Sequence, residues 1–336
     1  MPDKICVVYS HHKLGDLIWQ LPYIKSISEF HNQKITLITR EKTQAKDILQ
    51  DEIYIDQVHY NNFRKKFLYF YEIFLLYNFF KKNKFSHIYV LDKISRPAIA
   101  AKLAGTKNIL GPGIKNQKKW LTNKVFLKDA DFMISYKLGD LALQSKNFLN
   151  INGIKVNELI PSINIRNSTL NQVLPQITKD TRISMNVAFG VDSFEDYKMW
   201  YEEYFSELSH KLTENKIGNF FYLICGPEKR YIAEKIIKLS NHNNFLDCSN
   251  LNLLGIIKVI KNSNIFIGNN SGPLNLSSAL GVKTFGLISG TSVSALKHSN
   301  IIPVTPKDYV DQHSYDRIEM KKITVKSVLD AIKKNQ

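Results

Sequence analysis

The sequence predicts an α/β protein that consists of two similar domains, each built on a parallel sheet. Short apolar strands alternate with helical stretches from the start of the chain, and the same alternation restarts after a polar stretch near the middle. Strands that alternate with helices are typical of parallel βαβ units and of an open, doubly wound sheet. The length of 336 residues also suits two domains of ordinary size better than one.

The first half contains three clear strands and two clear helices. In chain order they are the strand KICVVYS, the helix GDLIWQLPYIKSISEF, the strand KITLITR, the strand HIYVLD, and a helix through RPAIAAKLAG that leads to NILGPG.

The stretch RKKFLYFYEIFLLYNFFKKNKF, residues 64–85, is aromatic-rich and flanked by lysines. We expect a helix that packs on the sheet, because exposing such a patch is costly. The alternative is an element at a membrane surface, with aromatic rings in the lipid interface and lysines on lipid phosphate. Both interpretations apply if one face of the helix packs on the sheet while its lysine-rich and aromatic edge contacts lipid.

The second half repeats the pattern. Its elements are the strand ISMNVAFG, the helix YEEYFSELSHKLTEN, the strand NFFYLICG, the helix EKRYIAEKIIKLSN, the strand NIFIGNN, the helix GPLNLSSALG and the strand KTFGLISG. The polar stretch 166–182 has weak periodicity and is predicted to be a linker. It separates an N-terminal domain (1–165) from a C-terminal domain (183–320). A C-terminal helix (321–336) follows, and packing on the N-terminal domain is one option for it. Because ligands bind beyond the carboxyl ends of parallel strands, the loops there should line a cleft between the domains.

The composition is that of an ordinary globular protein, with 44% hydrophobic and 23% charged residues. The first residues lack the apolar run of a signal peptide, and no window is long enough for a membrane span, so we expect a cytoplasmic protein.

Cys6, Cys225 and Cys248 are scattered, which favours small buried hydrophobic residues in a reducing compartment. His11 and His12 form the only close histidine pair, and adjacent side chains point apart, so we expect no metal.

The formal net charge is +16, which indicates an anionic partner: a nucleic acid, a membrane face or a phosphorylated substrate. A generally lysine-rich composition contributes to this charge, so charge alone does not choose among the three. No RNA- or DNA-binding motif is present, and a nucleic-acid partner is therefore the least favoured of them.

A glycine and an acid open the first helix, in SHHKLGD (residues 10–16). Asp16 is either a first-turn or capping acid, favoured by the helix dipole, or a reactive carboxylate at the end of a strand. The segment lacks both the dinucleotide-binding and the P-loop glycine patterns. A second KLGDL occurs at 137–141. No apolar strand precedes Asp140, so we expect it to be a surface helix acid.

Three segments of the second half combine a strand end with polar residues. In FGVDSFEDYKMW, Lys198 is either a point charge for a phosphate or a solvated lysine. In LICGPEKR, Glu228 is either a ligand for a ribose diol or part of an ordinary helix start. In IGNNSGPLNLSSALG, Ser271 and Gly272 open a helix whose free N–H groups suit a diphosphate, unless it is simply a capped helix.

In this order, the segments resemble glycosyltransferase family 9, the ADP-heptose:lipopolysaccharide heptosyltransferases. Leu14 to Pro22 resembles the family start "lGDvilttPal", and FSHIYVLD followed by AAKLAGTKNILGPG resembles "YDlviDl…lagar.rigf". Lys198-Met199-Trp200 and Gly226-Pro227-Glu228 match two further motifs, and residues 270–291 are close to "vDSGpmHLAaAlGvPtvaLFGpT". The resemblance covers nearly the whole chain. It implies the GT-B architecture, in which two Rossmann-like domains face each other across a cleft.

The resemblance also implies a function. The expected reaction is inverting, metal-independent transfer of a heptose or related sugar from an ADP-sugar to a lipopolysaccharide core acceptor, without a cofactor. Asp16 resembles the general base, and an aspartate with a pKa near ~3.9 is ionised at neutral pH. His12, Lys13 and Gly15 belong to the same acceptor-side loop. The residues implied on the donor side are Lys198, Glu228, Asn270, Ser271, Gly272, Asn275 and Thr291.

Two residues depart from the family pattern: Asn270 replaces the usual Asp, and Asn275 replaces the usual His. An amide still hydrogen-bonds a hydroxyl but carries no charge. The alternatives are therefore a catalytically weakened nucleotide- or glycan-binding protein, or a family member with a different nucleotide sugar or acceptor.

The expected partners are a nucleotide sugar, an anionic glycolipid acceptor and, transiently, the inner face of the inner membrane. The sequence does not indicate an oligomeric state.

Overall fold

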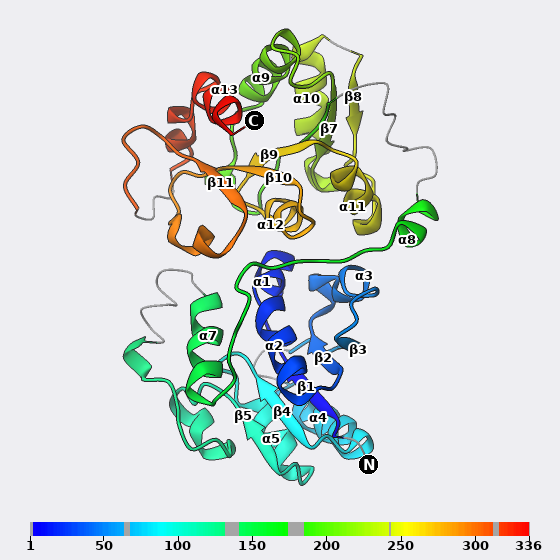
Figure 1. The fold of residues 1–336 in the computed structure, drawn as a ribbon, viewed down its shortest axis with the longest axis vertical. Helices are drawn as coiled ribbons and strands as arrows, with labels where there is room; N and C mark the ends of the chain where they lie inside the picture. The colour runs from blue at the N-terminus through cyan, green and yellow to red at the C-terminus, as the bar shows by residue number, and fades with distance from the viewer. Residues whose placement is uncertain are drawn as a thin grey trace. The chain divides into compact units, whose positions relative to one another are not determined.

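The chain folds into two units, Met1–Asn164 and Ile165–Gln336, each with its own sheet (Figure 1). The computed structural model describes residues 3–63, 68–131, 141–173, 185–241, 243–311 and 316–335. Both sheets are parallel throughout, as the alternation of strands and helices predicts. The predicted α/β class with two parallel-sheet domains is therefore confirmed.

The first unit has a five-stranded sheet in the order β3-β2-β1-β4-β5. Its strands are β1 (Ile5–Val8), β2 (Ile35–Thr39), β3 (Ile55–Tyr60), β4 (His87–Val90) and β5 (Asn108–Leu110). β1 lies at the centre and is buried along its whole length. β3 lies at the edge and is buried only at its first residue, so it lacks the apolar run by which β1, β2 and β4 are predicted.

The helices of the first unit cover both faces of this sheet. They are α1 (Leu14–Ile18), α2 (Leu21–His31), α3 (Ala45–Ile48), α4 (Tyr69–Asn83), α5 (Arg96–Leu103) and α7 (Leu141–Ile151), with 3₁₀ turns η1 (Glu41–Thr43) and η3 (Lys115–Trp120). The single helix predicted after β1 is wrong, because the chain forms α1 and α2 instead. Gln20 occupies the N-cap position of α2 without a side-chain capping bond, and Pro22 lies in the first turn. Proline has no N–H and clashes with a preceding helical turn, so it begins a new helix here.

α4 packs on the sheet as predicted for residues 64–85, and it lies beside α5 (Figure 1). Its inward side chains Ile73, Leu76 and Phe80 join Cys6 and Val8 of β1 in one apolar core. The opposite face of α4 is exposed. One helix therefore shows both features that the sequence left as alternatives, a packed face and an exposed aromatic one.

The second unit has a six-stranded sheet in the order β11-β10-β9-β6-β7-β8. Its strands are β6 (Asn186–Gly190), β7 (Phe220–Ile224), β8 (Phe245–Asp247), β9 (Ile265–Asn269), β10 (Lys283–Leu287) and β11 (Ile301–Val304). The sequence pattern predicts the four inner strands. The two outer strands β8 and β11 are short and partly exposed, so they are not predicted.

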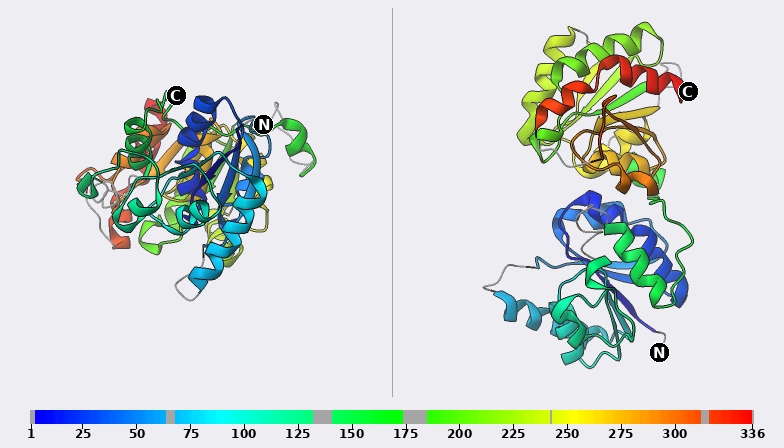
Figure 2. Two further views of the ribbon diagram at one scale, coloured as in Figure 1. Left: turned by 90° about the horizontal axis from the view of Figure 1, so that it is seen from below. Right: turned by 90° about the vertical axis from the view of Figure 1, so that its left-hand side faces the viewer.

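The helices of the second unit are α8 (Asn167–Asn171), α9 (Glu202–Glu214), α10 (Arg230–Ser240), α11 (Leu253–Lys261), α12 (Gly272–Ala279) and α13 (Val325–Lys334). The 3₁₀ turns are η4 (Asp196–Lys198), η5 (Pro227–Lys229), η6 (Ser294–His298) and η7 (Arg317–Lys322). α8 falls inside the stretch that we predicted to be a linker. α13 packs against α9 and β11 of its own unit (Figure 2).

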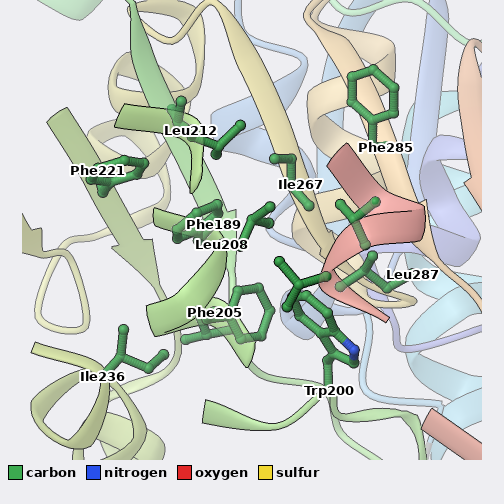
Figure 3. Close-up of a cluster of buried hydrophobic side chains, with 14 of the residues drawn as sticks. Phe189, Trp200, Phe205, Leu208, Leu212, Phe221, Ile236, Ile267, Phe285 and Leu287 are labelled. Atoms are coloured by element: carbon green, nitrogen blue, oxygen red, sulfur yellow. The ribbon is translucent and has the colours of Figure 1, made fainter. Parts of the chain in front are cut away.

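The core of the second unit is rich in aromatic rings (Figure 3). The ring of Phe189 lies 5.4 Å from that of Phe205 and 5.3 Å from that of Phe221, centroid to centroid. Val328 and Ile332 of α13 belong to the same cluster. The apolar face of α13 is thus buried within the second unit.

All three cysteines are buried and free, as predicted. In the part of the chain that the structure describes, no helix combines the length and the apolar character needed to cross a bilayer.

Two glycines face each other where β6 and β9 pair, Gly190 and Gly268. A Cβ on residue 268 would lie 2.9 Å from the Cα of Gly190, which is too close. We therefore expect Gly268→Ala to lower the free energy of unfolding by about 1–3 kcal/mol, as overpacking does. Urea denaturation followed by circular dichroism measures this. Gly226→Ala is the control, since its Cβ would meet its nearest atom at 3.6 Å; equal effects of both substitutions would contradict the steric account.

Candidate active site

Asp16 lies in the first turn of α1, directly after the loop that follows β1. The N-cap residue of α1 is Lys13, so the carboxylate of Asp16 does not cap the helix. The side chain of Asp16 is 30% exposed, and its Oδ2 lies 3.6 Å from Nδ1 of His11. The carboxylate is therefore fixed near one polar neighbour and still open to a ligand. His12 is exposed and Gly15 is buried in α1, so the predicted acceptor-side residues lie on one short segment.

His11 is a neighbour of Asp16 that the sequence did not single out. Its ring stacks on Tyr9, with centroids 5.0 Å apart and planes 10° apart. Burial acts to lower the pKa of His11, but the carboxylates of Asp16 and Asp92 outweigh it, and the net effect raises this pKa above its usual value. The imidazolium form is thus stabilised beside the Asp16 carboxylate.

Two polar side chains, one buried and one partly exposed, hold the loop that leads to Asp16. Asp92, at the end of β4, accepts a 2.7 Å hydrogen bond from the backbone N–H of Ser10. Arg40, at the end of β2, donates through Nε to the carbonyl of Ser10 at 2.5 Å and through its other nitrogens to the carbonyls of Asn62 and Phe63. The loop after the central strand is therefore tied to the ends of both neighbouring strands. Asp92 and Arg40 end the segments HIYVLD and KITLITR, so their place at strand ends was the available signal.

In the second unit, one buried amide joins the loop after β6 to the segment before α9. Asn269, the last residue of β9, is fully buried. Its Oδ1 accepts a hydrogen bond from the N–H of Trp200 (2.9 Å), and its Nδ2 donates to the carbonyl of Val191 (2.9 Å). The sequence analysis chose its neighbour Asn270 instead, because that residue falls on the family motif.

Lys198 lies on η4, immediately before Met199-Trp200. Its Nζ lies 3.2 Å from Oε2 of Glu195, and its side chain is only 16% exposed. Lys229, which the sequence analysis did not select, donates to the carbonyl of Ser193 at 2.7 Å and to Oδ1 of Asp196 at 2.9 Å. The polar segment that follows β6 therefore carries one ammonium group, that of Lys198, and binds a second, that of Lys229 on η5.

Glu228 lies exposed on η5, at the start of the helical segment after β7. The loop that carries it is held by Asp192, whose Oδ2 accepts a 2.7 Å hydrogen bond from the N–H of Gly226. Burial raises the pKa of Asp192 above its usual value, while that hydrogen bond and Lys229 act against the shift. The ends of β6 and β7 are thereby connected.

The start of α12 gathers five of the residues predicted on the donor side. Asn270 donates from Nδ2 to Oγ1 of Thr291 at 3.1 Å, and Asn275 donates from Nδ2 to the carbonyl of Ser271 at 3.3 Å. Gly272 is the first residue of the helix. Within the described residues, two solvent-shielded oxygens here have no hydrogen-bond partner, Oγ of Ser271 and Oδ1 of Asn275. Buried polar atoms are normally paired, so these two favour a ligand at this helix end.

Two further predictions concern Asp140 and the presence of a metal ion. Asp140, which we predict to be a surface helix acid, lies outside the described residues. Within residues 3–63, 68–131, 141–173, 185–241, 243–311 and 316–335, no three His, Cys, Asp or Glu side chains gather in a way that could hold a metal ion.

The sequence profile of glycosyltransferase family 9 (heptosyltransferase) matches residues 140–322. This match includes the segments that carry Lys198, Glu228 and the start of α12. The chain belongs to glycosyltransferase family 9, and it is a glycosyltransferase. A search of curated protein sequences gives no significant match.

Solved structures with the same fold cover almost the whole chain. The glycosyl transferase family 9 protein from Veillonella parvula is 16% identical, with a TM-score of 0.79 over 99% of this chain and 96% of that one. ADP-heptose lps heptosyltransferase II from E. coli is 14% identical, with a TM-score of 0.76 over 98% of each chain. The E. coli heptosyltransferase WaaC, solved with ADP-2-deoxy-2-fluoro heptose, is 14% identical, with a TM-score of 0.70 over 99% of this chain and all of that one. The fold is therefore that of the GT-B heptosyltransferases.

Asn269→Ala should lower the free energy of unfolding by about 3 kcal/mol, because it leaves two buried backbone groups without a partner. Thermal and urea denaturation measure the loss. Asn215→Ala is the matched control, since it removes one exposed side-chain hydrogen bond. A cost for Asn269→Ala no larger than for the control would show that the amide does not hold the two segments.

Asp16→Asn should lower the pKa of His11, because it removes a carboxylate that favours the imidazolium. The raised folded-state pKa of His11 adds stability that is present below its unfolded value of about 6.5 and is lost as the pH rises through the folded pKa. NMR titration of the histidine rings measures the shift in both proteins. His59 is the internal control, because its pKa is lowered by burial and by Lys46 rather than affected by Asp16. An unchanged His11 titration would mean that the two side chains are not coupled.

Proposed function

We propose that the protein is an inverting, metal-independent transferase that moves a heptose or related sugar from an ADP-sugar to a lipopolysaccharide core acceptor. Family membership and the fold support this proposal. The structures of E. coli WaaC include one with ADP, which supports an ADP-linked donor. The observation that carries the proposal is the partly exposed Asp16 carboxylate, which directly follows an anchored loop and does not cap its helix.

On the acceptor side, Asp16 acts as the general base. As the acceptor hydroxyl oxygen attacks the anomeric carbon of the donor sugar, its proton passes to the Asp16 carboxylate. The bond between the anomeric carbon and the phosphate oxygen breaks, and ADP leaves with the electron pair. The bonds from Asp92 and Arg40 anchor the backbone of Ser10 in the loop that leads to Asp16, and a well-positioned base contributes more than a mobile one. His12, Lys13 and Gly15 line the acceptor side of this loop.

On the donor side, the start of α12 and the lysine after β6 act on the leaving diphosphate. The helix dipole and the free N–H groups of Ser271 and Gly272 favour an anion, and Lys198 supplies a positive charge. Thr291, which already pairs with Asn270, contacts a phosphate. Glu228 accepts hydrogen bonds from the ribose hydroxyls. Each such contact to a developing oxyanion is worth on the order of 10²–10³ in rate.

Asn270 and Asn275 make the donor pocket less charged than the family pattern. The unpaired Oδ1 of Asn275 accepts a hydrogen bond from a sugar hydroxyl in this proposal. A neutral amide binds such a hydroxyl without the charge of an aspartate or a protonated histidine. The identity of the sugar is therefore the part of the proposal most sensitive to these two residues.

The acceptor is an anionic glycolipid, which suits a chain with a formal net charge of +16. The protein works in the cytoplasm and meets the acceptor at the inner face of the inner membrane.

Asp16→Asn should reduce sugar transfer by about 10²–10⁴, the usual contribution of a general base, and leave the Kd for ADP nearly unchanged. Release of ADP from ADP-heptose with a Kdo-bearing lipid acceptor measures transfer, and calorimetry measures ADP binding. Glu29→Gln is the control, because it neutralises an exposed acid on α2.

Retained transfer in Asp16→Asn would show that another group takes the proton. If the unmodified protein binds ADP but transfers sugar from none of a panel of nucleotide sugars, the protein is a nucleotide- or glycan-binding protein. If thermal shift shows stabilisation by another nucleotide sugar and not by ADP-heptose, the donor assignment is wrong while the reaction class stands.

A further inference from the structure

The outward face of α4 is an exposed surface that the proposed reaction does not use. We define the outer face of α4 by the exposed side chains Leu68, Phe70, Tyr71, Phe74, Leu75, Asn78, Lys81 and Lys82. Phe70 is 83% exposed and Phe74 is 57% exposed. Single exposed apolar residues are normal on a protein surface, but a contiguous patch of this kind marks an interaction site.

Helical periodicity arranges these side chains in two rows. Phe70, Phe74 and Lys81 are separated by four and seven residues, and Tyr71, Leu75 and Lys82 have the same spacing. Residues at these intervals lie on one side of a helix. Each row therefore leads from an aromatic ring through an apolar side chain to a lysine at the C-terminal end of the helix.

The outer face cannot be buried by a rotation of the helix. The opposite side of α4 already fills the core of the first unit with Ile73, Leu76 and Phe80. Arg96 on α5 also lies 3.0 Å from Glu72 and fixes the helix through an ion pair. The exposed rings are thus a stable property of the folded unit.

The charge of this surface has one sign. Lys81, Lys82 and Lys84 are exposed at the C-terminal end of α4. Glu72 is the only carboxylate between residues 68 and 84, and it is buried, with 3% exposure. The outer face therefore offers ammonium groups to a partner and no accessible carboxylate.

A groove of about 530 Å³ lies beside the outer face, between α4 and the residues at the end of β3. Tyr71, Leu75 and Lys82 line one side, and Tyr60 and Asn62 line the other. An apolar floor with a lysine at its rim suits a group that is apolar at one end and anionic at the other.

We propose that the outer face of α4 docks on a bilayer that contains anionic lipids. Aromatic rings prefer the boundary between headgroups and acyl chains, and lysines next to them contact lipid phosphate. A second copy of this chain fits less well. In a symmetric pair the same patch meets itself, and this patch has no accessible carboxylate, so a second copy offers its lysines no opposite charge. A bilayer with anionic lipids supplies the complementary charge. The proposal does not rest on the proposed reaction.

The test is co-sedimentation of the full chain with vesicles of phosphatidylcholine alone and of phosphatidylcholine mixed with phosphatidylglycerol, without substrate. The unmodified protein should sediment with the mixed vesicles and remain in solution with the neutral ones, and added salt should weaken binding. Lys81→Gln/Lys82→Gln should lower the partition coefficient by about thirtyfold, from the usual contribution of a lysine near an anionic surface. Phe70→Ser/Phe74→Ser should lower it by about tenfold or more.

Matched controls distinguish the effect of this face on vesicle binding from the effect of exposed charges and apolar side chains elsewhere on the protein. Ile53→Ser/Leu103→Ser removes two apolar side chains that are 80% and 61% exposed elsewhere on the first unit. Lys333→Gln/Lys334→Gln removes two exposed lysines at the end of α13. Both controls should bind the mixed vesicles as the unmodified protein does. Circular dichroism and melting temperature confirm that each variant is folded, which exposed substitutions permit.

Three results would overturn the proposal. The first is an unmodified protein that does not sediment with the mixed vesicles. The second is binding that the control pairs weaken as much as the α4 pairs do. The third is a self-associated protein in sedimentation velocity that Phe70→Ser/Phe74→Ser converts to monomer, because this would show that a second copy covers the face. Sugar transfer with a water-soluble acceptor should be the same in the α4 variants, so a failure of this proposal is distinct from a failure of the proposed reaction.

Discussion

The candidate donor site depends on the hydrogen bonds of one buried amide, that of Asn269. Parallel strands end in loops, and every buried polar group in those loops needs a partner. Asn269 donates to the loop after β6 and accepts from the segment before α9. An amide can do both with one side chain, whereas an ionised carboxylate accepts and cannot donate. In the first unit the same task is divided, since Asp92 accepts from Ser10 and Arg40 donates to it.

These hydrogen bonds explain how loops without regular secondary structure can hold reactive groups in place. Groups that stabilise a transition state act well only if they are oriented before the reaction begins. In the first unit, Asp16 follows a loop whose backbone is fixed on both sides. In the second unit, Trp200 anchors the segment that carries Lys198, and its indole also donates to the carbonyl of Ile323. The reactive side chains are thus partly exposed, while Asp92, Asn269 and Trp200, which position their loops, are buried.

The sequence predicts the inner strands of both sheets because burial on both faces requires a continuous apolar run. It does not predict β3, β8 and β11, because an outer strand needs no such run. The helix after β1 was predicted as one, although Pro22 marks the break. The motif residues of the site could be selected because their order resembles a family. Asn269, Asp92 and Arg40 could not be selected in that way: a polar residue at a strand end looks the same in sequence whether it is solvated or buried. His11 was missed because only the fold brings its ring onto Tyr9 and beside Asp16.

α4 shows why the sequence could not choose between a packed helix and a surface element. A helix that only packs on a sheet needs one apolar face, and α4 has two. The inner face packs against the sheet, and the aromatic residues of the outer face contribute no contacts to the core. Their exposure creates a risk of self-association, and the lysines on the same two rows reduce it because the same face of a second copy has no accessible carboxylate to pair with them. The same lysines favour a surface of opposite sign. The arrangement of rings and charges is therefore selective: it disfavours a second copy of the chain and accepts an anionic partner.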